Sequence, residues 1–218
     1  MQFCWNHAKT KWKIVADFSI EKTIDGPVIG LDEVGRWPVA GPVVSCGCHY
    51  LHYDDLESEI PITDSKKHTP RQRKKLFLFF KRLQKENKLQ YHLGYASVEE
   101  IDKINILEAT KLSMKRVINK FSIDNPNLII DGNFSLNYKN EKSVIGGDKK
   151  SLSIATASII AKVHRDRLMN ILDNKFNYYH WKSNAGYGTK KHIEAIHKYG
   201  ITLFHRKSFE PIKSLLNK

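Results

Sequence analysis

The chain has 218 residues, 41% hydrophobic and 27% charged, which is enough for one substantial core with at most a small appendage. Its 36 Lys and Arg residues outnumber 23 Asp and Glu residues, and the formal charge of +13 favours a polyanionic partner, with a generic basic surface as the alternative. Three cysteines are too few for a disulfide framework, and the longest apolar runs are too short to cross a bilayer, which favours a cytoplasmic protein without a membrane partner.

Residues 1–25 mix aromatic and basic residues without clear periodicity, so we expect an irregular lead-in to one domain over residues 26–218. The first strong signal is the apolar run that begins at Val28 and is bounded by Pro and Gly, which predicts a buried strand. Asp32 and Glu33 follow this run directly. Two carboxylates this close repel each other unless a cation lies between them, which favours a divalent metal.

Neighbouring side chains of a regular strand point to opposite faces of the sheet. Asp32 and Glu33 can therefore share a ligand only if the pleat breaks at this point, and we expect Gly35 to permit such a break.

Residues Val39–Tyr50 predict a second strand, with Cys46 and Cys48 on one of its faces. A zinc site that adds His49 and His52 matches no common spacing, so we favour ordinary strand cysteines. The polar stretch Tyr53–Lys67 then connects to a helix.

Thr69 as N-cap, Pro70 and Gln72 mark the start of this helix as a capping box with proline at the first position. The expected core face is Leu76, Phe79, Phe80 and Leu83. Basic residues crowd the other face, which favours contact with phosphates over a merely solvated surface. They are Arg71, Arg73, Lys74, Lys75, Lys81, Arg82 and Lys85.

A strand over Gln90–Ala96 and a helix from Ser97 to about Lys120 follow, and a further capping box marks the start of the helix. The next apolar strand ends on Asp131. In an open α/β sheet functional groups collect where strands end, so we expect Asp131 to face Asp32 and Glu33 across one crevice.

The turn Gly146–Asp148 leads into a helix over Ser151–Asn174, on which Ser158, Lys162 and Asp166 share one face. Asp166 can therefore reach the same crevice, with Lys162 beside it, although a surface salt bridge between the two is the commoner meaning of this spacing. Alternating strands and helices up to this point predict an α/β domain, and a helical C-terminal part begins at about residue 176.

The candidate metal ligands that the sequence offers are the carboxylates of Asp32, Glu33 and Asp131, with Asp166 or Asp148 as a further member. Such oxygen ligands suit Mg²⁺ or Mn²⁺ and are poor ligands for zinc. Two ions roughly 4 Å apart can activate a water and stabilise the leaving oxygen of a phosphodiester, so this set and the positive charge indicate a nuclease.

Seven segments closely resemble, in order, the signature segments of bacterial ribonuclease HII over roughly residues 28–211. They are GLDEVGRWPVAGPVV, TDSKK, NILEATKLSM, LIIDGN, GDKKSLSIATASIIAKVHRDRLM, GYGTKKH and HRKSFEP. The resemblance implies a ribonuclease H-like mixed five-stranded sheet flanked by helices, with a helical C-terminal extension. It also implies metal-dependent hydrolysis of the RNA strand of RNA-DNA hybrids and incision at ribonucleotides embedded in duplex DNA, leaving 3'-hydroxyl and 5'-phosphate ends.

Carried over by position, the resemblance implies a catalytic and metal-binding set that includes Asp166 and leaves out Asp148, which then supports its turn. The set is Asp32, Glu33, Asp131 and Asp166. The family's Gly-Arg-Gly loop, whose backbone contacts the 2'-hydroxyl, corresponds to Gly35, Arg36 and Trp37, and its partner tyrosine corresponds to Tyr187. We count Lys162, beside Asp166, among the substrate-binding residues.

Trp37 departs from the family, since an indole stands where the family has glycine. One hypothesis is that its bulk and its restricted backbone weaken discrimination at a single ribonucleotide. The alternatives are that the ring points outward while the peptide still docks, or that it stacks on a sugar or base.

Two other functions compete with this interpretation. Ribonuclease HIII carries an extra N-terminal substrate-binding domain, for which residues 1–25 are too short. A hybrid-binding protein that has lost catalysis is motivated by Trp37 but disfavoured by the intact acidic residues. We expect a monomer that acts on hybrids and ribonucleotide-containing duplexes, with its protein partners left open.

If Trp37 limits selectivity, Trp37→Gly raises incision at a lone ribonucleotide relative to cleavage of a long hybrid, because glycine restores close approach of the backbone. The measurement is the ratio of kcat/KM on the two substrates. An unchanged ratio would remove the idea that this position limits selectivity.

Overall fold

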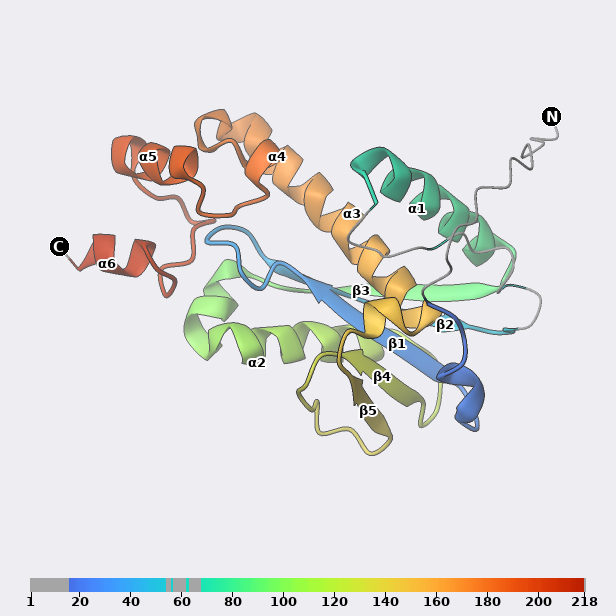
Figure 1. Cartoon of the computed structure of the whole chain (residues 1–218). Coiled ribbons are helices and arrows are strands. Elements are labelled where there is room, and N and C mark those ends of the chain that lie inside the picture. The colour runs from blue at the N-terminus through green and yellow to red at the C-terminus, as the bar shows by residue number, and fades with distance from the viewer. Residues whose placement is uncertain (1–15, 54–55, 57–61, 63–67, 218) are drawn as a thin grey trace, which may run out of the picture.

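The computed structural model describes residues 16–53, 56, 62 and 68–217. A five-stranded sheet in the order β3-β2-β1-β4-β5 forms its centre (Figure 1). The strands are β1 (Val28–Val34), β2 (Val43–Tyr50), β3 (Leu89–Ala96), β4 (Asn127–Asp131) and β5 (Glu141–Val144). Strand β2 is antiparallel to both β1 and β3, whereas β1, β4 and β5 run parallel, so the expected mixed five-stranded sheet is confirmed.

Helices cover both faces of this sheet, with α1 (Pro70–Lys85) and α3 (Leu152–Lys175) on one side and α2 (Val98–Ile118) on the other (Figure 1). Helix α3 lies directly against β1 and β2. Gly30 permits this close approach, because a Cβ there would lie 2.5 Å from the Cβ of Ser153. The sheet is therefore the middle layer of three, and α3 passes close to the end of β1.

The start signals of the helices are confirmed. The Thr69 hydroxyl accepts from the Gln72 N–H, and the Gln72 side chain accepts from the Thr69 N–H at 2.7 Å, which closes the capping box of α1. Ser97 and Glu100 form the same arrangement at the start of α2. On α1, however, Phe77 is buried and Phe79 only partly so, a small shift of the expected core face.

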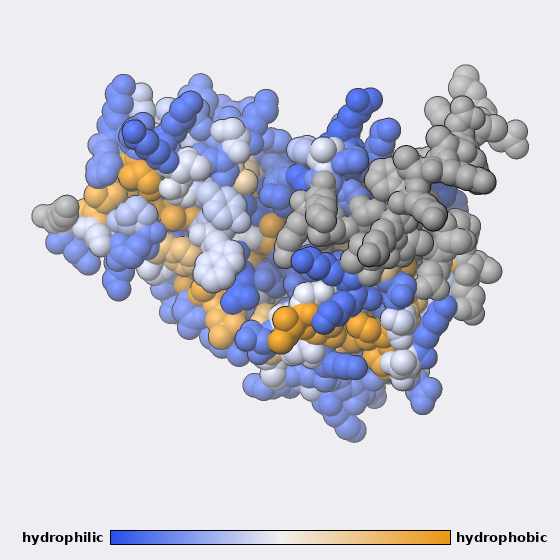
Figure 2. Space-filling view, viewed as in Figure 1, coloured by the Kyte–Doolittle hydropathy of each residue, from blue (hydrophilic) through white to orange (hydrophobic). Residues whose placement is uncertain are grey.

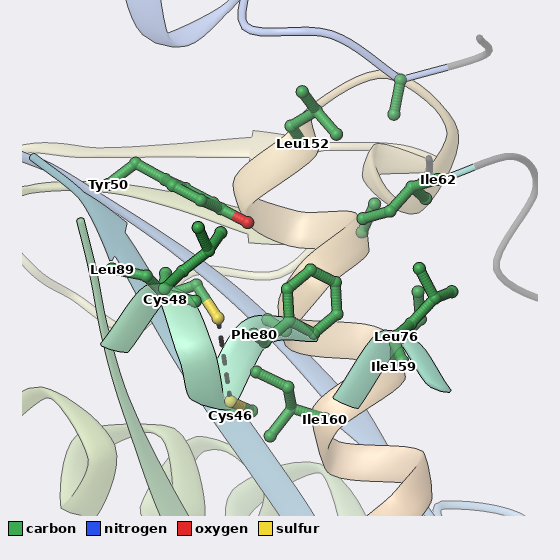
Figure 3. Packing of buried hydrophobic residues seen from close by; sticks show 14 of the residues in the cluster. Cys46, Cys48, Tyr50, Ile62, Leu76, Phe80, Leu89, Leu152, Ile159 and Ile160 are labelled. Carbon is green, nitrogen blue, oxygen red and sulfur yellow. Dashed lines mark hydrogen bonds between the residues drawn. The ribbon is translucent and has the colours of Figure 1, made fainter. Parts of the chain in front are cut away.

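The largest part of the core lies between the sheet and helices α1 and α3. Figure 3 shows Cys46 and Cys48 of β2 directed toward Phe80 and Ile160, with their sulfur atoms 4.0 Å apart. Both cysteines are free and buried, as expected for ordinary strand cysteines. His49 instead contacts the Val28 carbonyl through Nδ1 at 2.9 Å.

Three expectations about elements were wrong or incomplete. Strand β2 begins at Val43 rather than Val39, because Gly41 has a φ of +86° and the chain turns there. Asn105, at φ 66°, interrupts α2, and its side chain accepts from the N–H groups of Leu107 and Glu108 at 2.9 and 3.1 Å. Strand β5 has no apolar alternation, since Lys142 and Ser143 are exposed, and its pattern did not predict it.

The C-terminal part is helical, as expected, with α4 (Trp181–Asn184), α5 (Lys190–Tyr199) and α6 (Ile212–Leu216). Gly200 closes α5 at a φ of +78°. An isolated bridge between Ala40 and His205 ties this part to the turn after β1. Hydrophilic residues cover most of the face in Figure 2, and hydrophobic residues reach it in separate groups, one of them over the C-terminal helices.

None of the helices in the described part of the chain is long and apolar enough to cross a membrane. Residues 1–15 of the expected lead-in, and most of the polar connection before α1 including TDSKK, lie outside the described residues. Near the start of the described part, Asp17 forms an isolated bridge with Ser151.

Candidate active site

A pocket of about 410 Å³ opens where β1 and β4 end. Because these strands are parallel neighbours, the residues at their carboxyl ends emerge side by side. Asp32 and Glu33 of β1 and Asp131 of β4 line the pocket. Its other lining residues are Val34, Gly35, Arg36, Trp37, Arg73, Asp148, Ser158, Ile159, Lys162 and Tyr187. The topology thus brings together three of the four carboxylates expected from the sequence.

No break of the pleat precedes Gly35, contrary to expectation, because β1 stays paired with β2 as far as Val34. The pairing of β1 with β4 ends earlier, at Leu31. Beyond Leu31 the β4 side of the strand is open, and we infer that the pocket reaches Asp32 and Glu33 around this open edge.

The two carboxyls of β1 strongly disfavour ionisation. Burial, followed by the charges of Glu33 and Asp131, raises the pKa of Asp32 well above its usual range, and a hydrogen bond with Ser158 only partly offsets this. Burial is also the main cause that raises the pKa of Glu33 to about 7. The Arg36 cation lowers this pKa, whereas the charge of Asp131 raises it. The pocket therefore gathers acidic groups whose ionised forms the Arg36 cation only partly stabilises.

Backbone N–H groups hold two of these carboxyls. Asp131 accepts from the N–H of Gly147 at 2.7 Å, and Asp32 accepts from the N–H of Glu33 at 2.7 Å. The second oxygen of Glu33, Oε2, is buried and has no hydrogen-bond partner. Asp148, which the resemblance leaves out of the ligand set, is buried and also lines the pocket.

Asp166 lies one step outside this group. Its carboxylate is 2.7 Å from Lys162 Nζ and 3.4 Å from Arg73, so the ion pair expected from the helical spacing is present. Asp166 lines a neighbouring basic groove, whereas Lys162 and Arg73 line the carboxylate pocket. Lys162 and Arg73 thus connect Asp166 to the pocket. Helical periodicity predicted the contact with Lys162 but not the contact with Arg73.

The donor set fits a hard divalent cation. In the described part of the chain, no three His, Cys, Asp or Glu side chains stand close enough together to enclose an ion. However, Asp32, Glu33 and Asp131 share one pocket, in which burial and the charge of Asp131 raise the pKa values of Asp32 and Glu33, and Glu33 Oε2 has no hydrogen-bond partner. Carboxylate oxygens are the ligands that Mg²⁺ and Mn²⁺ prefer, and a cation among them would remove the repulsion.

The turn after β1 forms the rim of the pocket. Gly35 has a φ of +99°, which favours glycine, whereas Trp37 is not among the residues with positive φ. The backbone at position 37 therefore has a conformation that does not require glycine, and the Trp37 ring is 78% exposed. The Arg36 guanidinium lies 6.0 Å from the Trp37 ring centroid and 3.6 Å from Glu33.

Tyr187 lines the pocket from the C-terminal part and is 46% exposed. The Nδ1 of buried His192 contacts its carbonyl oxygen at 2.8 Å. Arg165 and Arg206 are also fully buried, and we did not expect them from the sequence, in which an arginine gives no sign of burial.

Comparison with known proteins is consistent with this geometry. The family model described as Ribonuclease HII matches residues 29–212. The ribonuclease HII of Wolbachia pipientis subsp. Culex pipiens is 47% identical over 200 residues, covering 91% of this chain and 98% of that protein. That of Macrococcus caseolyticus is 46% identical over 197 residues, covering 90% of this chain and 72% of that protein.

Solved structures share the fold. The ribonuclease H2 of Pyrococcus horikoshii OT3 superposes with a TM-score of 0.70 at 28% identity, covering 88% of this chain and 98% of that one. Bst-RNase HIII in complex with Mn²⁺ superposes with a TM-score of 0.66 at 16% identity, covering 88% of this chain and 69% of that one.

The raised pKa of Glu33 predicts how metal-free stability depends on pH. Since the folded protein holds this proton more tightly than the unfolded chain does, stability falls as pH rises from about 4.5 to about 7. Glu33→Gln removes this loss, so its stability advantage over the parent should grow by about 3 kcal/mol across that window. Denaturant unfolding in EDTA at several pH values measures it, and a pH-independent difference would contradict it. Added Mn²⁺ should stabilise the parent more than the variant.

Proposed function

The chain belongs to the ribonuclease HII family and is a ribonuclease H enzyme, and from this premise we propose how its residues perform the reaction and on which substrates. The family acts on RNA-DNA hybrids and depends on divalent metal ions. We propose that this chain hydrolyses the RNA strand of hybrids and also incises at ribonucleotides embedded in duplex DNA. The products carry 3'-hydroxyl and 5'-phosphate ends.

The observation that carries the proposal is the shared pocket of Asp32, Glu33 and Asp131, in which burial and mutual repulsion raise the pKa values of the first two. These carboxylates would hold Mg²⁺ or Mn²⁺, with Asp166 completing the set. Such ions would supply an activated water and charge stabilisation at the phosphate and the leaving oxygen. The Mn²⁺ complex of Bst-RNase HIII, a protein of the same fold, supports this choice of ion.

The protein's own groups orient these ligands. The Gly147 N–H holds one oxygen of Asp131, and Ser158 of α3 bonds to Asp32, so both carboxylates are held in fixed orientations beside the pocket. Lys162 and Arg73 bind Asp166, and both also line the pocket. They therefore lie where they can contact a phosphate that enters beside the carboxylates.

The rim of the pocket would distinguish ribose from deoxyribose. The 2'-hydroxyl is both a donor and an acceptor, and a backbone segment can contact it only where the chain comes close. Gly35, Arg36 and Trp37 offer such a segment, and Tyr187 lies on the same rim. We propose that the tyrosine ring packs against the ribose at the RNA-to-DNA junction, while the exposed Trp37 ring contacts a neighbouring sugar or base.

A basic groove beside the pocket would hold the phosphates of the duplex. It lies between α1, β3 and α3, and its cationic residues are Arg73, Lys74, Lys81 and Arg167. The groove adjoins the carboxylate pocket at Arg73, which lines both. Phosphate contacts of this kind give affinity without sequence preference and weaken as salt rises.

Asp131→Asn tests the proposed site, because it removes one anionic ligand and keeps the shape of the side chain. We expect kcat/KM to fall by at least about a hundredfold on both a full hybrid and a duplex with one ribonucleotide, with Mg²⁺ or with Mn²⁺. Asp124→Asn, at an exposed carboxylate after α2, is the matched control and should cut like the parent.

The ends are identified by whether the cut strand primes a DNA polymerase directly, which requires a 3'-hydroxyl. Undiminished cutting by Asp131→Asn would show that the proposed site is wrong. A parent that binds hybrids but does not cut them with either metal would instead favour the hybrid-binding alternative.

A further inference from the structure

Two arginines lie fully buried beneath the rim of the pocket, and within the described residues neither forms an ion pair with a carboxylate. They are Arg165 of α3 and Arg206 of the segment between α5 and α6. A buried charge is costly unless hydrogen bonds compensate it. Burial and the neighbouring Arg165 cation lower the pKa of Arg206 to about 9, so this guanidinium remains charged at neutral pH.

Backbone carbonyl groups supply the compensation. Arg206 donates to the carbonyl oxygens of Gly35 at 2.5 Å, of Arg36 at 2.9 Å and of Gly41 at 2.8 and 3.0 Å. Arg165 donates to those of Ala40, Pro42 and Ala185 at 3.0, 3.1 and 2.8 Å. Five of these six carbonyls belong to the turn between β1 and β2, so the two cations fix the course of that turn.

The bonds of Arg206 also fix where the turn's N–H groups point. In a trans peptide the C=O and the following N–H point in opposite directions. Because Gly35 and Arg36 direct their carbonyls inward to Arg206, the amides of Arg36 and Trp37 are directed away from it. Within the described residues neither of these two N–H groups donates to a protein acceptor. They are therefore free donors on the turn that lines the carboxylate pocket.

Arg206 is itself held in place. Its own N–H donates to the Val39 carbonyl at 2.9 Å. The next two residues, Lys207 and Ser208, donate their N–H groups to the Asp102 carboxylate of α2, each at 2.9 Å. The guanidinium lies 4.9 Å from the Phe209 ring centroid. The C-terminal part and α2 thus fix the position of the Arg206 guanidinium, which in turn binds the carbonyls of the turn.

We propose that Arg206 is a positioning residue for ribose recognition, which presents the amides of Arg36 and Trp37 to the 2'-hydroxyl without touching the substrate. This inference rests on the function proposed above and adds the residue that sets its specificity. It also accounts for the tolerance of tryptophan at position 37, since the amide is what the turn presents and the ring is exposed.

Lysine cannot replace this arginine. The planar guanidinium carries donors in a fixed fork, and here it contacts three carbonyls at once, whereas an ammonium is a compact point charge on a flexible chain. Arg206→Lys keeps the charge and most of the volume while it releases part of the turn.

The test is made in the Asp131→Asn background, where binding is measured without cutting. Affinity is compared between a duplex with one ribonucleotide and the same duplex in DNA only. We expect Arg206→Lys to reduce the preference for the ribonucleotide about tenfold, while affinity for the DNA duplex and its salt dependence stay unchanged. Arg116→Lys, at an exposed arginine that binds Glu100, is the matched control and should keep the preference.

An equal loss of affinity for both duplexes, or an unchanged preference in folded Arg206→Lys, would overturn this inference but not the proposed function. A parent background without any preference would contradict the proposed incision at embedded ribonucleotides. If Arg206→Lys does not fold, backbone NMR of the parent background decides instead. The amides of Arg36 and Trp37 should then shift on binding the ribonucleotide duplex and not on binding the DNA duplex, and identical shifts would overturn the inference.

Discussion

Burial of Asp32 and Glu33 beside Asp131, and the repulsion among the three carboxyls, is the constraint on which the rest of the site depends. The fold can hold these groups together because the backbone hydrogen bonds of β1 and β4 fix where they emerge, whatever the side chains prefer. Arg36 offsets only part of this cost at Glu33, so the pocket is arranged to receive a further cation. In the proposed function, ions held there would act beside the turn proposed to contact the ribose.

The carboxylates of the pocket and the arginines beneath its rim differ in how their buried charge is compensated. The carboxylates have only partial protein partners, and Glu33 Oε2 has no hydrogen-bond partner. The guanidiniums of Arg165 and Arg206 are satisfied by carbonyl dipoles from the turn after β1 and from Ala185. The carboxylate pocket is therefore open to an external cation, whereas the surroundings of the arginines are closed and rigid. This division suits an enzyme that must bind ions reversibly and still hold a recognition surface in a fixed shape.

The sequence predicted those parts of the fold that depend on local signals. Capping boxes placed the starts of α1 and α2, and apolar runs ending in acid placed Asp32 and Asp131 at neighbouring strand ends. Strand β5 could not be found in this way, because its pairing with β4 rather than its own composition makes it a strand. The break at Asn105 likewise depends on a side-chain cap that competes with the helix.

At the site, residue spacing predicted the pair of Lys162 and Asp166 but not the third partner, Arg73, which comes from a helix far away in the sequence. The burial of Arg165 and Arg206 was equally hidden, since only the folded chain shows that backbone carbonyls surround them. The four proposed ligands came from the family resemblance as much as from spacing, and three of them share the pocket.

The most direct test of this account is to locate Mn²⁺ in crystals of the parent protein by its anomalous scattering. The account predicts an anomalous peak within the pocket, bound directly by oxygens of Asp32 and Asp131. A peak elsewhere on the surface, with none among these carboxylates at saturating Mn²⁺, would contradict it.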